Sequence, residues 1–283
     1  MTNGTTPATD QPATQLRAAT VAAYAQVLGG PGPGAPSGEA IPLPDALNTM
    51  TVDDAYAFQR GVLADLEQTW DVRRAGYKLS VTNATDQAII SASEPTFGVL
   101  TDRHLLSSGA HIDLTRANNP LVEAELVMRT MAEIDVDTPF AELASSVEFA
   151  GCLEIPVSRF AEWWPAGEGP RLTLSGLIAD NSVAGFVVIG DEWRSLTDAE
   201  LTSTDVHLTL PSGAVVAGTS THVLGHPLRA VVWLLERLAR SGDRLPVGSI
   251  VSTGTLLSPN RATRGAFRAD FGSGLGSVVV NFT

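Results

Sequence analysis

The sequence lacks three features that would assign it to common classes of protein. It has one cysteine, Cys152, which excludes an intrachain disulfide and fits a reducing compartment. No apolar run approaches the roughly 18 residues of a membrane-spanning helix. Residues 1–15 carry no basic segment before an apolar core, so we expect no signal peptide. We therefore expect a cytoplasmic protein with no membrane partner.

Basic side chains are also scarce. The 283 residues include 18 Lys and Arg against 31 Asp and Glu, which gives a formal net charge of −13. The Lys and Arg residues form no cluster along the chain, and binding to a phosphate backbone needs a basic footprint. We therefore expect no nucleic-acid partner. With 44% hydrophobic residues, the chain is long enough to bury a sizeable core.

Composition divides the chain into three parts. Residues 1–14 are rich in Thr, Pro and Ala and are predicted to be a disordered tail. Residues 15–73 form a helical N-terminal part, with helices over 15–28 and 51–70 and a Pro- and Gly-rich linker over 29–42. In residues 74–283, short β-type runs alternate with turn residues, which predicts a β-rich domain that carries the site. The expected fold class is α+β.

Two helices are expected inside the β-rich domain. One begins at Pro139, a residue type favoured at the first helical position, and runs to about residue 150. The other follows a capping His226 and ends at Gly242. Residues 171–179 read as a strand, and residues 272–277 as a Gly-rich turn between two strands.

Glu123 and Glu125 interrupt an apolar run that is typical of a strand, "LVEAELVM". Alternate residues of a strand share a face, so both carboxylates point to the same side. At about 6–7 Å apart they would repel by roughly 2–3 kcal/mol at an effective dielectric constant near 20. Solvent exposure, protonation or a bound cation would relieve this repulsion. An edge strand with one wet face is therefore an open alternative to a site.

Three further segments carry candidate polar groups. Glu154 is a lone carboxylate in "GCLEIP", and three glutamates could hold a hard cation such as Mg²⁺ or Mn²⁺ with positions left open for substrate. Lys78 in "GYKLSVT" is either a lysine at a strand edge or a cation for an anionic substrate and a general acid–base group. Asp180 and Asn181 form either a plain turn or a hydrogen-bonding loop beside a site.

Eight short motifs follow one another in a fixed order, and this order resembles one known family. The motifs are Y-K-L-x-V-T, E-P-x-F-G-x-L-x-D, V-E-A-E-L, L-E-I-x-x-S-R, A-D-N, L-G-H-P-L, G-S-I-V-x-T-G and G-L-G-S-V. Over residues 48–283 the chain resembles the hydratase/decarboxylase branch of the fumarylacetoacetate hydrolase superfamily. The resemblance implies a rolled, mixed β-sheet domain with a small helical N-terminal part, and a homo-oligomer.

The resemblance also implies roles for residues. Glu123, Glu125 and Glu154 match the ligands of a divalent metal, Mg²⁺ or Mn²⁺, and Lys78 matches the family lysine that holds the substrate anion or assists proton transfer. The substrate would be a small-molecule 2-oxo or 2-hydroxydienoate acid of the kind met in aromatic catabolism.

The implied activity is that of a lyase which adds water to a 2-hydroxy-2,4-dienoate and gives a 4-hydroxy-2-oxo acid. Decarboxylation of a 4-oxalocrotonate-like vinylogous 2-oxo diacid in the same site is the main alternative. Hydrolysis of a C–C bond in an acylpyruvate is a third option, and it normally uses a His–Glu dyad near the N-terminal part of the site. All five histidines follow Lys78 in the sequence, and none forms a convincing dyad. A non-catalytic relative that keeps the fold is a further alternative.

Three departures from the family pattern fall near the implied substrate pocket. Thr96 stands where many hydratases carry Asp, Ser80 stands where Gly is usual, and Ser182–Val183 replaces Ala-Ser. We expect these positions to decide which substrate is used and which reaction occurs. The residues assigned to substrate binding are Leu79, Ser80, Thr96, Asp180, Ser182 and Val183.

Overall fold

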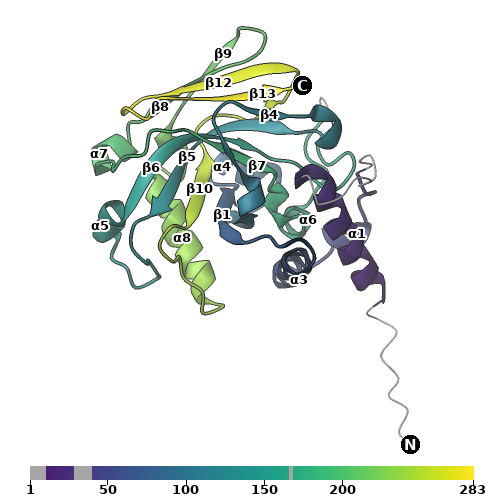
Figure 1. The fold of residues 1–283 in the computed structure, drawn as a ribbon. Helices are drawn as coiled ribbons and strands as arrows, with labels where there is room; N and C mark the ends of the chain where they lie inside the picture. The colour runs from purple at the N-terminus through teal and green to yellow at the C-terminus, as the bar shows by residue number, and fades with distance from the viewer. Residues whose placement is uncertain (1–10, 29–39, 166–167) are drawn as a thin grey trace, which may run out of the picture.

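The computed structural model describes residues 11–28, 40–165 and 168–283, and three helices precede the first strand (Figure 1). They are α1 (Gln11–Leu28), α2 (Asp45–Asn48) and α3 (Val52–Trp70). The Thr51 side chain caps α3 by accepting a hydrogen bond from the Asp54 N–H, as predicted. The tail predicted to reach residue 14 overlaps α1, which begins at Gln11. Residues 1–10 of that tail and 29–39 of the predicted linker lie outside the described residues.

Two mixed sheets form the body of the protein. The larger has the order β2-β1-β10-β5-β6-β7-β3, with β11 paired to β5, and the smaller has the order β4-β13-β12-β8-β9. Parallel pairs (β1 with β10, β3 with β7, β4 with β13) occur among antiparallel ones. The larger sheet comprises β1 (Arg74–Ser80), β2 (Thr96–Thr101), β3 (Leu105–Ser107), β5 (Leu121–Thr130), β6 (Val147–Ile155), β7 (Phe186–Ile189), β10 (Ile250–Thr255) and β11 (Asn260–Arg261). The smaller comprises β4 (Ala110–Ile112), β8 (Asp205–Thr209), β9 (Val215–Thr219), β12 (Gly265–Phe271) and β13 (Ser277–Phe282). This arrangement confirms the predicted α+β class with mixed sheets.

In the part of the chain that the structure describes, five α-helices follow the first strand. They are α4 (Ala84–Ile89), α5 (Phe140–Leu143), α6 (Leu174–Ala179), α7 (Asp198–Leu201) and α8 (Pro227–Ala239). His226 caps α8, since its ring nitrogen accepts from the Leu228 N–H at 3.1 Å, as predicted. No helix of the described residues is long and apolar enough to cross a membrane.

Two predicted elements are wrong. The helix expected over 139–150 ends by residue 146, because Val147 already pairs with Thr130 of β5 and the pairing continues along β6. The strand expected over 171–179 is largely helix α6, whose first turn is capped by the Thr173 side chain accepting from the Gly176 N–H. In both places tertiary pairing or capping outweighs the local apolar pattern.

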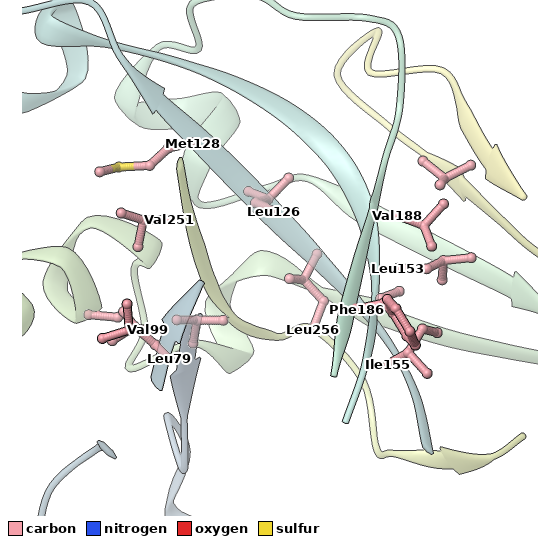
Figure 2. Close-up of a cluster of buried hydrophobic side chains, with 14 of the residues drawn as sticks. Leu79, Val99, Leu126, Met128, Leu153, Ile155, Phe186, Val188, Val251 and Leu256 are labelled. Atoms are coloured by element: carbon pink, nitrogen blue, oxygen red, sulfur yellow. The ribbon is translucent and has the colours of Figure 1, made fainter. Parts of the chain in front are cut away.

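One face of the larger sheet is apolar and lies in the main core (Figure 2). Alternate residues of neighbouring strands supply it: Leu126 and Met128 from β5, Leu153 and Ile155 from β6, Phe186 and Val188 from β7. The smaller sheet, α8, α1 and α3 contribute side chains to the same cluster, so the N-terminal helices share the core of the strands. The opposite face of β5 and β6 is therefore the one that carries the three glutamates.

Candidate metal and substrate site

The pairing of β5 with β6 brings the three glutamates together. Glu123 is the direct cross-strand partner of Glu154, and Glu125 lies opposite Cys152. Directly opposed residues of an antiparallel pair point to the same face. One carboxylate oxygen from each glutamate lies within 4.8 Å of the other two. Spacing along the sequence does not show whether the three glutamates meet. The register of β5 against β6 brings them together.

The carboxylates are only partly satisfied by protein donors. Glu125 and Glu154 are buried, and Glu123 is partly exposed. Glu125 Oε2 accepts from Ser252 Oγ at 2.6 Å and from the Gly254 N–H at 2.9 Å. Glu125 Oε1 and Glu154 Oε1 are buried, and no described residue donates a hydrogen bond to them. Because buried polar atoms are rarely left without a partner, this donor set fits a hard divalent cation.

Burial also shifts the protonation of the three groups. It raises the pKa of Glu123 to about 8, with the nearby charge of Glu154 adding to the shift. It raises the pKa of Glu125 well above its usual value, and it raises the pKa of Glu154 in spite of the cationic Lys78. Without a cation, the ionised triad is therefore unfavourable, and a divalent ion would reverse that preference.

Lys78 lies in the same cluster. It is fully buried in β1, its Nζ is 3.2 Å from Glu154 Oε2, and it donates a hydrogen bond to Ser80 Oγ. Register explains its place, since Lys78 pairs with Ser252 of β10, the residue that donates to Glu125. Complete burial rules out the alternative of a lysine at a wet strand edge. The structure thus joins the lysine and all three glutamates.

A cavity opens beside Glu123 and takes in three of the predicted substrate residues. Leu79, Ser80 and Val183 belong to its lining, with the polar Thr82, Thr255 and Asp86. Much of the remaining wall is apolar and comes from α4 and from the segments 156–165 and 168–177. Of the three glutamates only Glu123 belongs to this lining, so the carboxylate cluster meets the cavity at that residue.

The other three predicted substrate residues lie behind the lining. Thr96 Oγ1 accepts from Ser182 Oγ at 3.1 Å, and both side chains are buried. Asp180 ends helix α6, so the reading of a turn between two strands is wrong. Its carboxylate is fully buried and accepts from Arg159 Nε and from Ser158 Oγ, both at 2.6 Å. Burial raises the pKa of Asp180 despite the charge of Arg159.

Three successive left-handed residues place Val183 in the cavity wall. Asn181, Ser182 and Val183 have φ angles of 53°, 48° and 51°. The Asn181 side chain holds this loop against β2 by accepting from the Val99 N–H at 2.7 Å and donating to the Val99 carbonyl at 2.9 Å. The approach requires glycine at position 98, since a Cβ there would lie 2.1 Å from the Asn181 carbonyl oxygen.

The sequence does not reveal several residues of the site. Ser252 gives no local signal, because its contact with Glu125 depends on strands far apart in the chain. Asp86 lies on α4 after a capping Asn83, a pattern that predicts a helix start without pointing to a cavity. Trp163 and Trp164 come from an irregular segment, and only their aromatic character hints at a pocket.

Comparison with known proteins agrees with this geometry, although no family model matches the chain. The chain is 31% identical over 223 residues to a 2-keto-4-pentenoate hydratase of Paraburkholderia xenovorans (strain LB400), covering 78% of this chain and 80% of the relative. It is 26% identical to a 4-oxalocrotonate decarboxylase of Pseudomonas putida, covering 82% and 86%. Its fold matches a solved 4-oxalocrotonate decarboxylase from Pseudomonas putida G7, complexed with magnesium and adipate, with a TM-score of 0.80 at 23% identity, covering 95% of this chain and 98% of that one. The chain therefore belongs to the hydratase/decarboxylase branch of the fumarylacetoacetate hydrolase superfamily.

Proposed function

We propose that the protein is a divalent-metal-dependent hydro-lyase. It adds water to a 2-hydroxy-2,4-dienoate and forms a 4-hydroxy-2-oxo acid. The observation that carries the proposal is the triad of Glu123, Glu125 and Glu154 beside Lys78, with Glu123 in the lining of a cavity. The similarity to named hydratases at about 30% identity supports the same reaction.

The three glutamates would hold Mg²⁺ or Mn²⁺, both of which prefer carboxylate oxygens. When bound, the metal supplies a Lewis acid for the carboxylate and 2-oxygen of the substrate. Ser252 and the Gly254 N–H fix the orientation of the Glu125 carboxylate, which keeps its Oε1 free for the cation.

Lys78 would stabilise the negative charge of the substrate. Its ammonium group lies on the same face as the glutamates and would hold the anionic 2-oxygen of the substrate as the dienol ketonises. The dienol loses its O–H proton, C5 gains a proton, and water then adds its oxygen to C4 and a proton to C3. Ser80, which accepts from Lys78, fixes the position of Nζ during these transfers.

The test is direct turnover. Purified protein with Mg²⁺ and 2-hydroxypenta-2,4-dienoate should remove the dienol absorbance and release 4-hydroxy-2-oxopentanoate. Chelation with EDTA should stop the reaction, and added Mg²⁺ should restore it. A protein that binds Mg²⁺ yet leaves this dienol and its longer homologues unchanged would refute the assignment.

Decarboxylation is the second candidate, and Thr96 is the observation that favours it. Many hydratases of the family carry Asp at this position, whereas here the side chain is a hydroxyl that accepts from Ser182. Release of CO₂ from 2-oxohex-3-enedioate, with no loss of 2-hydroxypenta-2,4-dienoate, would select this reaction.

We also propose that the enzyme works as a homo-oligomer in the cytoplasm. The family resemblance and the single cysteine support this proposal. Light scattering of the purified protein measures the oligomeric state.

A further inference from the structure

The wall of the cavity is mainly hydrocarbon. Beyond Glu123 and the polar side chains near it, the lining includes Ile89, Ile90, Trp163, Trp164, Leu172 and Leu177. These side chains come from α4 and from the segment that precedes and includes α6. A binding site for the tail of a small molecule normally matches the chemistry of that tail.

The charges that face the cavity have one sign. Among its described lining residues, the ionisable side chains are Glu123 and Asp86, and both are acidic. The segments outside the described residues (1–10, 29–39 and 166–167) contain no Lys, Arg or His. The chain therefore offers no basic side chain in this lining to pair with an anionic tail.

The basic groups close to the lining are engaged elsewhere. Arg171 pairs with Glu162 and Glu168, and Arg261 donates to the Trp164 carbonyl. His222 Nδ1 lies 3.2 Å from the Thr255 carbonyl oxygen, and Lys78 is beside Glu154. A second carboxylate of a substrate would lose its hydration in an apolar pocket without gaining a counter-charge.

We propose that the natural substrate carries an uncharged hydrocarbon tail, alkyl or aryl, at the end remote from its 2-oxo acid group. This inference rests on the proposed function and names the substrate class for that site. Each methylene of the tail that leaves water for this wall should raise kcat/KM about fourfold. A dicarboxylic substrate is rejected because its far end meets Asp86 and apolar side chains.

A series of matched substrates tests the proposal. The compounds are 2-hydroxy-2,4-dienoates whose C5 carries hydrogen, methyl, ethyl or carboxymethyl, assayed with Mg²⁺. We expect kcat/KM to rise about fourfold per added carbon from hydrogen to ethyl, and the carboxymethyl compound to fall at least about a hundredfold below the ethyl compound. A carboxymethyl compound as good as the ethyl compound would overturn the inference.

Binding separates failure of this inference from failure of the proposed reaction. If no dienoate turns over, titration of the Mg²⁺-loaded protein with 2-oxoheptanoate and 2-oxoheptanedioate still compares the two tails. Tighter binding of 2-oxoheptanoate supports the apolar tail, whatever the reaction is. Equal or tighter binding of the dioate contradicts it.

A variant at the cavity wall tests whether the substrate tail binds in this cavity. Ile89 lines the cavity and is 49% exposed, so I89R should fold, and I89M is the matched control without charge. We expect I89R to shift the ratio of dioate to monoacid affinity at least tenfold toward the dioate, while I89M leaves the ratio within twofold. The same ratio in both variants would show that the tail does not lie in this cavity.

Discussion

Replacing Glu123 by Gln should make the metal-free protein more stable while abolishing its response to Mg²⁺. The amide keeps the shape of the side chain and cannot ionise, so the folded state neither holds a proton at this position nor bears a third charge beside Glu125 and Glu154. A residue kept for packing alone would behave differently, since its replacement would lower stability with or without metal. The direction of the change therefore separates a ligand role from a structural role.

The size of the effect follows from two features of the site. Two unit charges 4.8 Å apart, the outer limit of the oxygen cluster, repel by about 3.5 kcal/mol at an effective dielectric constant near 20. A pKa raised from 4.5 to about 8, first by burial and then by the charge of Glu154, lowers the free energy of unfolding by about 4 kcal/mol at pH 7.5. Since Glu123 is partly exposed, we expect E123Q to gain about 2–4 kcal/mol in free energy of unfolding without metal.

Urea unfolding at pH 7.5, with EDTA or with excess Mg²⁺, measures both parts of this prediction. Wild-type protein should shift to a higher urea midpoint with Mg²⁺, and E123Q should not. The control is E236Q, an exposed position on α8 where the same change should alter stability by less than about 0.5 kcal/mol. If E123Q is no more stable than wild type in EDTA, or if it responds to Mg²⁺ as wild type does, the reasoning is refuted.

Three further changes probe the rest of the site. K78Q should lower kcat by about 10²–10⁴-fold while calorimetry still detects Mg²⁺ binding, since the proposed mechanism assigns Lys78 to the 2-oxygen of the substrate. An unchanged kcat would show that Lys78 has no part in the mechanism. D180N should lower the free energy of unfolding by about 3–5 kcal/mol, because it leaves Arg159 buried without its partner. A variant with unchanged stability and a raised KM would instead show that Asp180 contacts the substrate. In EDTA, stability should fall as pH rises from about 4.5 to 8, because the folded state holds a proton on Glu123 that the unfolded state releases. The rise in Tm caused by Mg²⁺ should grow over the same range, and a rise independent of pH would contradict competition between protons and metal.

The site is predictable from the sequence where local alternation decides the outcome. Glu123 and Glu125 lie two apart in a strand, so their shared face and the apolar face opposite follow from strand geometry. The meeting with Glu154 does not follow, because it depends on how residues 131–146 turn the chain and on the resulting register. The family resemblance predicts that Glu154 joins the other two glutamates, and the pairing of β5 with β6 explains how it does so.

The errors have physical causes of the same kind. Residues 171–179 alternate apolar and polar side chains at first, yet Thr173 caps a helical turn and the segment becomes α6. The sequence places Asp180 beside the substrate, whereas its buried partner Arg159 lies 21 residues earlier and gives no local sign of the pairing. Helix caps and long-range ion pairs override patterns that extend over only a few residues.

Gly98 shows how the absence of a side chain can shape a binding site. It contributes nothing to the cavity lining. Because it has no Cβ, the Asn181 loop can pack directly on β2, and this packing sets the position of Val183 in the cavity wall. Alanine at this position would lift the loop and narrow or reshape the pocket without changing a single residue that meets the ligand. Libraries designed to alter substrate choice should therefore vary the packing beneath this loop as well as the residues on the cavity wall.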